Sequence, residues 1–270
     1  MIAISIILGI LILVLIAGKY RLSIQFKKEV HELFGDSKNI SSRTFSYAQI
    51  SGLPEPVQRY FKRVLQNGQP YISYVRIKHD GTFKTGLDKP WVKILGEQYA
   101  TTDKPGFIWK GSTTLFTARD MYIKNQGRLV VSLFGLLPIV NGKGKNFNQG
   151  ELLRWLGESV LYPTNLLPSQ SLKWSAIDQH TAQFTFNHDS FSLVYMVTFN
   201  DVGEIIQLQT KRYMDQDHLE SWVIKMANYK EINHVLVPTN FDVLWRLRGG
   251  DFSYARFNIT KVEYNNPTLF

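Results

Sequence analysis

The chain has 270 residues, of which 44% are hydrophobic, 13% aromatic and 20% charged, so it can bury a core and is neither disordered nor fibrous. It contains no cysteine, which excludes disulfide scaffolds, thiolate metal sites, iron–sulfur clusters and cysteine nucleophiles. Its net charge of +9 is concentrated in residues 1–150, which carry 21 basic and 9 acidic side chains, but these are dispersed and accompany no nucleic-acid-binding motif.

The first predicted element is an apolar helix. Residues 2–18 contain no charged side chain and, as a helix, would be about 25 Å long, close to the hydrocarbon thickness of a bilayer. A cleaved signal peptide is the alternative, but it requires basic residues before the apolar run and a small-residue cleavage site after it. Neither is present, so we predict a transmembrane anchor over residues 1–18.

Basic residues follow this segment, whereas none precedes it. They are Lys19, Arg21, Lys27 and Lys28. The positive-inside rule therefore predicts a cytoplasmic soluble domain, with an extracytoplasmic domain as the alternative because a single short anchor is weakly oriented. The same charges would attract anionic headgroups, unless they form only a solvated basic face.

Residues 19–52 are predicted to be a juxtamembrane spacer, since residues 29–52 are polar and rich in serine. A helix is expected to begin at Leu53-Pro54-Glu55-Pro56, where proline is tolerated in the first turn, and to end at Gly68. Residues 53–264 should form one domain followed by a tail at 265–270. A chain that begins near Ser42 is therefore expected to fold and to be soluble.

From residue 71 onward the hydrophobic period becomes that of strands. The predicted strands cover residues 71–79, 81–85, 91–101, 107–114, 121–129, 181–187, 191–199, 205–213, 221–229, 235–247 and 252–264. Gaps such as Asn200-Asp201-Val202-Gly203 are too short for parallel crossovers, so the neighbours should be antiparallel.

The two groups of strands are separated by residues 130–171, which contain a predicted helix over residues 149–161. Its apolar face would carry Trp155 and its polar face Glu151, Arg154 and Glu158. The expected fold class is α+β: an N-terminal transmembrane helix, then a large curved antiparallel sheet of about 11 strands, a half-barrel with helices packed on one face.

These motifs, taken in order, resemble a bacterial family of uncharacterised membrane-associated proteins that contain a domain of unknown function. The motifs lie at residues 53–60, 107–109, 119–122, 150–156, 163–168, 174–178, 237–238, 243–245 and 250–256. The order of sheet and helix also looks like the half-barrel of lipoprotein carriers of the LolA and LolB type. The resemblance implies a connection with envelope lipids and supplies no catalytic residue.

The candidate site is a set of mixed charges in these motifs. Its charged members are Arg119, Asp120, Glu151, Arg154, Glu158 and Asp178, and its aromatic members are Trp109 and Trp155. Two carboxylates beside an arginine could perform acid–base chemistry, or they could form an ion-pair network that fixes the helix to the sheet. The tryptophans could line a pocket or fill the core.

Six histidines form no metal-binding pattern, and neither a phosphate-binding loop nor a nucleophile elbow is present, so we expect no metal, no cofactor and no catalytic residue. The first hypothesis is a membrane-anchored binding module that holds a lipidic or other apolar ligand in the hollow of the curved sheet. One alternative is an envelope enzyme, a hydrolase or isomerase that uses buried carboxylates. A second alternative is a scaffold that recruits a protein partner.

Overall fold

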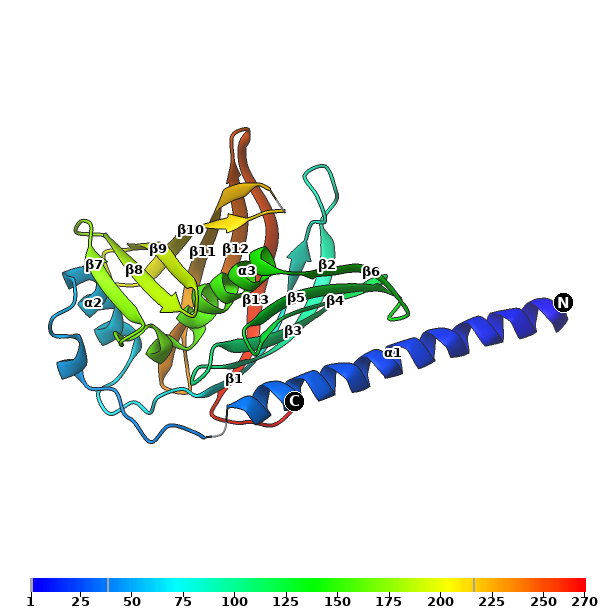
Figure 1. Ribbon diagram of the computed structural model, residues 1–270, viewed down its shortest axis with the longest axis horizontal. Coiled ribbons are helices and arrows are strands. Elements are labelled where there is room, and N and C mark those ends of the chain that lie inside the picture. The colour runs from blue at the N-terminus through cyan, green and yellow to red at the C-terminus, as the bar shows by residue number, and fades with distance from the viewer. Residues whose placement is uncertain (1, 38, 216) are drawn as a thin grey trace.

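The structure is a computed structural model that describes residues 2–37, 39–215 and 217–270. A large curved sheet wraps around one helix, and a long N-terminal helix extends away from it (Figure 1). The helical elements are α1 (Ile2–Asp36), η1 (Tyr47–Ile50), α2 (Glu55–Val64), α3 (Lys145–Gly157), η2 (Glu158–Leu161) and η3 (Pro163–Leu166), where η denotes a 3-10 helix.

Thirteen antiparallel strands form the sheet, so the predicted α+β class is confirmed. The first group is β1 (Tyr74–Phe83), β2 (Val92–Thr101), β3 (Gly106–Ser112), β4 (Phe116–Ile123), β5 (Gln126–Leu133) and β6 (Leu137–Lys143). The second group is β7 (Leu172–Ala176), β8 (Thr181–His188), β9 (Phe191–Phe199), β10 (Ile205–Tyr213), β11 (Leu219–Ile232), β12 (Val235–Leu247) and β13 (Gly250–Tyr264).

The strand order is β6-β5-β4-β3-β2-β1-β13-β12-β11-β10-β9-β8-β7. Each group is a meander of hairpins, as the short gaps predicted. The two groups join where β1 pairs with β13, and a bulge between Lys78 and His79 interrupts that register. The sheet edges are β6 and β7, one from each group.

The predicted count of about 11 strands was too low, for local reasons. Gly81 lies inside β1 and does not end it, so two predicted strands are one. One predicted segment, 121–129, contains the turn between β4 and β5. The two edge strands were missed because β6 contains Pro138 and lies almost wholly exposed, and β7 has only five residues.

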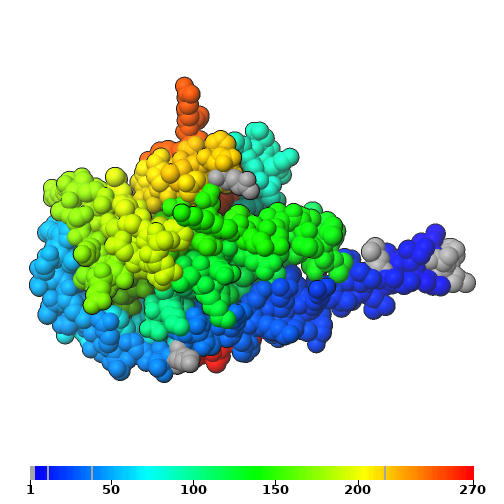
Figure 2. Space-filling model, viewed as in Figure 1, coloured from blue at the N-terminus to red at the C-terminus, as the bar shows by residue number. Residues whose placement is uncertain are grey.

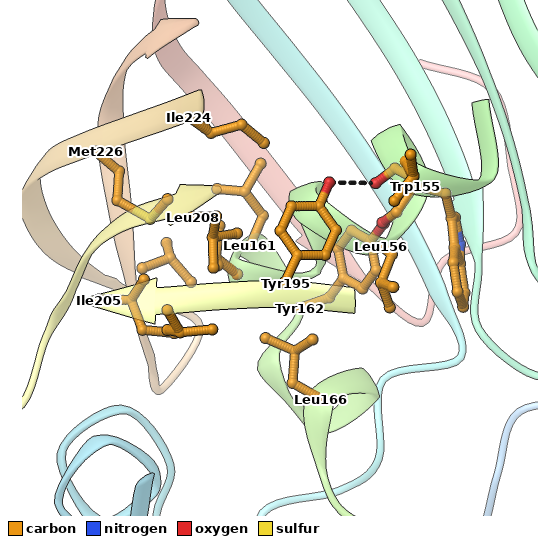
Figure 3. Packing of buried hydrophobic residues seen from close by; sticks show 14 of the residues in the cluster. Trp155, Leu156, Leu161, Tyr162, Leu166, Tyr195, Ile205, Leu208, Ile224 and Met226 are labelled. Atoms are coloured by element: carbon orange, nitrogen blue, oxygen red, sulfur yellow. Dashed lines mark hydrogen bonds between the residues drawn. The ribbon is translucent and has the colours of Figure 1, made fainter. Parts of the chain in front are cut away.

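Helix α3 fills the hollow of the sheet. Its side chains Leu152, Trp155 and Leu156 are buried against the inner face, where they join one large hydrophobic core. Figure 3 shows this packing: the Tyr195 hydroxyl on β9 donates to the Leu153 carbonyl of α3 at 2.9 Å. The inner face is therefore covered by a helix and aromatic side chains, and α2 packs nearby against β12 and β8.

The second half of α1 packs on the opposite, outer face. Phe26, Val30 and Leu33 recur at helical spacing and are buried against Tyr99, Ile108 and Met121 of β2, β3 and β4. Burial of each such side chain contributes about 1.5–3 kcal/mol. Helices thus lie on both faces of the sheet, whereas the sequence analysis predicted helices on one face only.

This contact changes the description of residues 19–52. Residues 19–36 continue α1 without a break, and the following segment contributes Phe45 and Ile50 to the core. The tail also packs, because Phe270 contacts Tyr99 on the outer face. The three buried apolar residues Phe26, Val30 and Leu33 stand among polar residues of the second half of α1, so the composition of this region did not reveal them.

Most of the side chains that the structure describes in the first half of α1 are exposed. The helix is long and apolar enough to cross a membrane, with a window of mean hydropathy 2.0 that is only 6% buried. Both a membrane anchor and a signal sequence have these properties. The helix projects beyond the sheet in Figure 1 and Figure 2.

Candidate functional site

A layer of charged side chains lies between α3 and the inner face of the sheet. The Arg154 guanidinium contacts Asp120 of β4 at 2.6 Å, Glu158 at 2.8 Å and the Gln98 amide oxygen of β2 at 3.3 Å. The Gln98 amide nitrogen donates to Glu158 at 2.6 Å. One arginine on α3 therefore joins the helix to two strands, and we call these four residues together with Glu151 and Arg212 the polar layer.

Glu151, one turn before Arg154, contacts Arg212 of β10 at 3.1 Å and is almost completely buried. Its Oε2 atom and the Oδ1 atom of Asp120 receive no hydrogen bond from a described donor, yet the two carboxyl groups are within hydrogen-bonding range. Burial, followed by the charge of Asp120, raises the pKa of Glu151 well above its ordinary value, and the two arginines only partly oppose this. A protonated Glu151 that donates to Asp120 satisfies both oxygens.

Aromatic rings form the floor beneath this layer. The Arg154 guanidinium lies over the rings of Trp109 at 4.8 Å and Phe107 at 5.0 Å. The Trp109 indole N–H donates to Nε2 of His79 on β1 at 2.8 Å. Because burial disfavours the imidazolium, the pKa of His79 is lowered to about 4, so the ring is neutral and accepts this bond.

The flat arrangement of these rings requires two glycines. A Cβ atom at Gly96 would lie 1.8 Å from His79 Nε2, and one at Gly111 would lie 2.1 Å from the Trp109 ring. Any side chain at either position would therefore displace a ring from the inner face. Gly96 and Gly111 belong to the site for this reason.

A cavity of about 800 Å³ lies beyond one end of α3. Its apolar walls are formed by Ile72, Trp155, Leu167, Leu172 and Phe186. Its charged walls are formed by Asp36, Arg43, Asp103, Lys104 and Lys124, with His188 beside them. The cavity therefore has an apolar side and a charged side, and Asp36 is the last residue of α1.

The structure brings together five of the eight predicted site residues. Trp109, Asp120, Glu151, Arg154 and Glu158 all belong to the polar layer or its floor. Trp155 lies on the other side of α3, where its indole N–H donates to the Thr101 carbonyl at 2.9 Å and its ring borders the cavity.

The other two predicted residues lie elsewhere. Arg119 points to the outer face, because side chains alternate along β4, and there it forms a buried ion pair with Glu29 of α1. Asp178 lies in the turn between β7 and β8 and accepts from the backbone of His180 at 2.8 Å, which lowers the pKa of Asp178. Neither residue touches the polar layer.

Sequence reasoning missed Gln98, His79 and Arg212. Gln98 and His79 stand at inward positions of strands whose other inward residues, such as Ile77 and Ala100, are apolar, and a polar residue in that pattern is a usable signal. Arg212 has no such signal, since Lys211 precedes it and both are ordinary strand residues. No group of three metal-binding side chains occurs in the described ranges.

Fold and site together define an open antiparallel sheet that wraps around one helix and carries an apolar N-terminal helix. Residues 43–257 match the Family of unknown function (DUF6544), and the chain belongs to that family. The family resemblance found in the sequence motifs is thus confirmed. No curated protein matches the chain.

Two solved structures are similar in fold. A LolA superfamily protein from Nitrosomonas europaea has a TM-score of 0.43 and 10% identity, over 78% of this chain and 92% of that one. A putative outer membrane lipoprotein-sorting protein domain from Vibrio parahaemolyticus has a TM-score of 0.46 and 9% identity, over 80% and 93%.

Proposed function

We propose that the chain is a membrane-anchored module that binds an amphipathic, lipid-like ligand in the cavity at the end of α3. The cavity is the observation that carries this proposal. Its volume of about 800 Å³ lies within the usual range for small-molecule sites, about 300–1,000 Å³. The expected position of the ligand moves accordingly from the hollow of the sheet, which α3 fills, to the end of that helix.

The walls of the cavity indicate the chemistry of the ligand. Phe186 and Leu172 would cover an apolar chain, whereas the basic side chains Arg43, Lys104 and Lys124 outnumber the acidic ones around the opening. Lys104 and Lys124 are already paired, at 3.0 Å with Asp36 and at 2.6 Å with Glu32. We therefore expect an anionic headgroup to bind Arg43. The Arg43 guanidinium lies over the Tyr71 ring at 4.3 Å.

The continuity of α1 supports retention of the N-terminal helix as an anchor. Residues 16–18, where a signal peptidase would have to cut, lie inside an uninterrupted helix, and the same helix docks on the sheet from Phe26 onward. The domain would lie on the cytoplasmic side by the distribution of basic residues, with the extracytoplasmic side as the alternative.

The alternative of an enzyme would use the carboxyl pair of Asp120 and Glu151. Neither residue borders the cavity, and both are less than 10% exposed. The binding proposal is the better supported of the two because the cavity has room for a ligand and no residue of the polar layer lines it.

Ligand uptake can be measured on the full chain held in an amphipathic polymer, since free detergent would compete for the cavity. A fluorescent fatty acid should bind saturably in the micromolar range. Ser171→Trp places an indole in the cavity and should weaken binding at least tenfold, whereas Ser175→Trp, on the exposed part of β7 outside the lining, should change it less than twofold. Absence of saturable uptake, or equal uptake by both variants, would refute the proposal.

A further inference from the structure

A second apolar surface lies at the outermost hairpin of the sheet. Residues 133–140, which we call the hairpin tip, join β5 to the edge strand β6. Five of its large apolar side chains are between 39% and 60% exposed: Phe134, Leu136, Leu137, Ile139 and Val140. Leu115 is 55% exposed as well, and its carbonyl accepts a hydrogen bond from the Phe134 backbone N–H at 2.8 Å. A cluster of this kind on a surface marks an interaction site.

The backbone of the hairpin tip contains a strained residue, Phe134. Phe134 has a φ of +53°, a left-handed conformation that a bulky aromatic residue rarely adopts and that glycine, asparagine or aspartate adopts at lower cost. Phe134 remains 39% exposed and is not part of the hydrophobic core. Strain kept for the sake of an exposed aromatic side chain points to contact with something outside the domain.

The hairpin tip also touches α1 at one particular residue. A Cβ atom at Gly18 would lie 2.3 Å from Leu136, and one at Gly135 would lie 3.3 Å from the Gly18 carbonyl, so the two backbones are in close contact. Gly18 ends the apolar run and Lys19 begins the polar part of the helix. Figure 2 shows the green hairpin directly beside the blue helix.

Charge around the hairpin tip has one sign. Residues 121–150 contain no acidic side chain and four basic ones, and two of these, Arg128 and Lys143, face each other across β5 and β6 at the base of the hairpin. Lys19 and Arg21 of α1 lie just past the contact with the tip. An apolar tip followed by basic side chains matches a bilayer interface with anionic headgroups.

We propose that the hairpin tip inserts into the bilayer interface beside α1 and forms a second contact of the domain with the membrane. This inference rests on the proposed function, because it requires the first half of α1 to lie in the membrane. The helix and the hairpin would then fix the tilt of the domain, since one helix alone leaves the domain free to rotate about its axis.

The absence of native cysteine makes a direct test simple. Leu137→Cys, Ile10→Cys and Val202→Cys, at positions that are 60%, 56% and 59% exposed, would each be labelled with an environment-sensitive NBD maleimide. The full chains would be reconstituted into vesicles of phosphatidylcholine and phosphatidylglycerol. Quenching by lipids that carry a nitroxide on the acyl chain is then compared with quenching by aqueous iodide.

We expect lipid nitroxides to quench the probe at 137 at least threefold more than the probe at 202, with a blue-shifted emission. Val202 lies in the turn between β9 and β10, far from α1 along the sheet, and serves as the matched control. If lipid nitroxides quench the probe at position 10 but the probe at 137 behaves like the one at 202, the anchor is supported and the hairpin contact is wrong. If 137 is shielded from iodide but not reached by lipid nitroxides, a second chain covers the tip and the inference is equally overturned. If 10 itself is not quenched, the anchor fails and this inference fails with it.

Discussion

At the scale of single residues, the raised pKa of the buried Glu151 carboxyl has a measurable consequence. Because the pKa of Glu151 is raised in the folded state, this carboxyl contributes most to the free energy of unfolding below about pH 4.5, the ordinary pKa of glutamate. That contribution is lost as pH rises towards the folded-state pKa. Glu151→Gln keeps a donor to Asp120 and an acceptor for Arg212. The free energy of unfolding of this variant should therefore not fall above pH 4.5, whereas that of the wild type should fall by up to about 1.4 kcal/mol per pH unit over part of that range.

The measurement is chemical denaturation of the full chain at a series of pH values. Glu55→Gln, at a glutamate that is 64% exposed and outside the polar layer, is the control for the loss of one carboxylate. Equal slopes in wild type and Glu151→Gln would contradict the raised pKa of Glu151.

His79 predicts the opposite dependence on pH. Its folded-state pKa of about 4 lies below the ordinary 6.5, so its contribution to stability is present above pH 6.5 and is lost as pH falls towards 4. The loss amounts to roughly 3–4 kcal/mol at most. His79→Gln, which keeps an acceptor for the Trp109 indole, should remove this acid-side loss, and His31→Gln controls for the removal of an exposed imidazole. An unchanged acid limb in His79→Gln would contradict the buried neutral histidine.

These residues also show how far the sequence could specify the site. Helical spacing was enough to put Glu151, Arg154 and Glu158 on one face, because i, i+3 and i+7 is a local relation. Arg119 and Asp120 were predicted together, yet adjacent strand residues face opposite sides, and the site could receive only one of them. That Asp120 faces α3, and that Arg212 pairs with Glu151, depend on where β4 and β10 lie relative to the helix, which the local sequence does not specify.

At the scale of elements, α1 is attached to the outer face by an ion pair as well as by apolar packing. The side chains of Arg119 and Glu29 are 4% and 14% exposed, whereas Lys124 and Glu32, one turn further along the helix, are 58% and 49% exposed. Glu29→Ala leaves a buried arginine without its partner and should cost about 3–5 kcal/mol. Glu32→Ala should cost less than about 1 kcal/mol. Denaturation curves of both variants provide the comparison, and similar costs would mean that α1 does not dock as described.

The docked helix also bears on a chain that begins near Ser42, which the sequence predicts to be soluble and folded. Without residues 22–36, the apolar side chains Tyr99, Ile108 and Met121 lose their cover. A chain that begins at Lys19 should elute as a monodisperse species in gel filtration. A chain that begins at Ser42 should aggregate or melt at least several degrees lower, since three buried apolar side chains on α1 contribute about 1.5–3 kcal/mol each. Equal behaviour of the two would argue against the outer-face contact.

Elements with a strong period were predictable, and edge elements were not. The helix predicted between Leu53 and Gly68 is α2, which the structure has at Glu55–Val64, and its buried side chains Val57, Tyr60, Phe61 and Val64 recur at helical spacing. The edge strand β6 lacks the alternation of a half-buried strand because both of its faces are exposed. Because β6 is exposed on both faces, its sequence pattern did not predict a strand. The same exposure leaves its apolar residues free for the proposed membrane contact.

At the scale of the whole molecule, one helix would link the membrane to the cavity if its apolar segment is the proposed anchor. α1 runs from the exposed apolar segment, past the hairpin tip at Gly18, along the outer face to Asp36 at the wall of the cavity. The 18 residues from Lys19 to Asp36 are about 27 Å long as a helix. The cavity would therefore lie about 27 Å along the helix from the bilayer edge, so a lipid ligand must leave the bilayer completely to reach it.

This geometry makes the fate of the N-terminal segment decisive. Its apolar residues insert at about −0.3 to −0.6 kcal/mol each, with no charge to oppose them, so the full chain should fractionate with membranes and resist carbonate extraction. Protease added from one side should then degrade the domain only from the cytoplasmic face if the basic residues after Gly18 set the orientation. Mass spectrometry of the mature protein provides the counter-test: an N-terminus near Lys19 would mean that the segment is a signal peptide. The docked residues 22–36 would then remain on the domain, but α1 would no longer connect it to the bilayer.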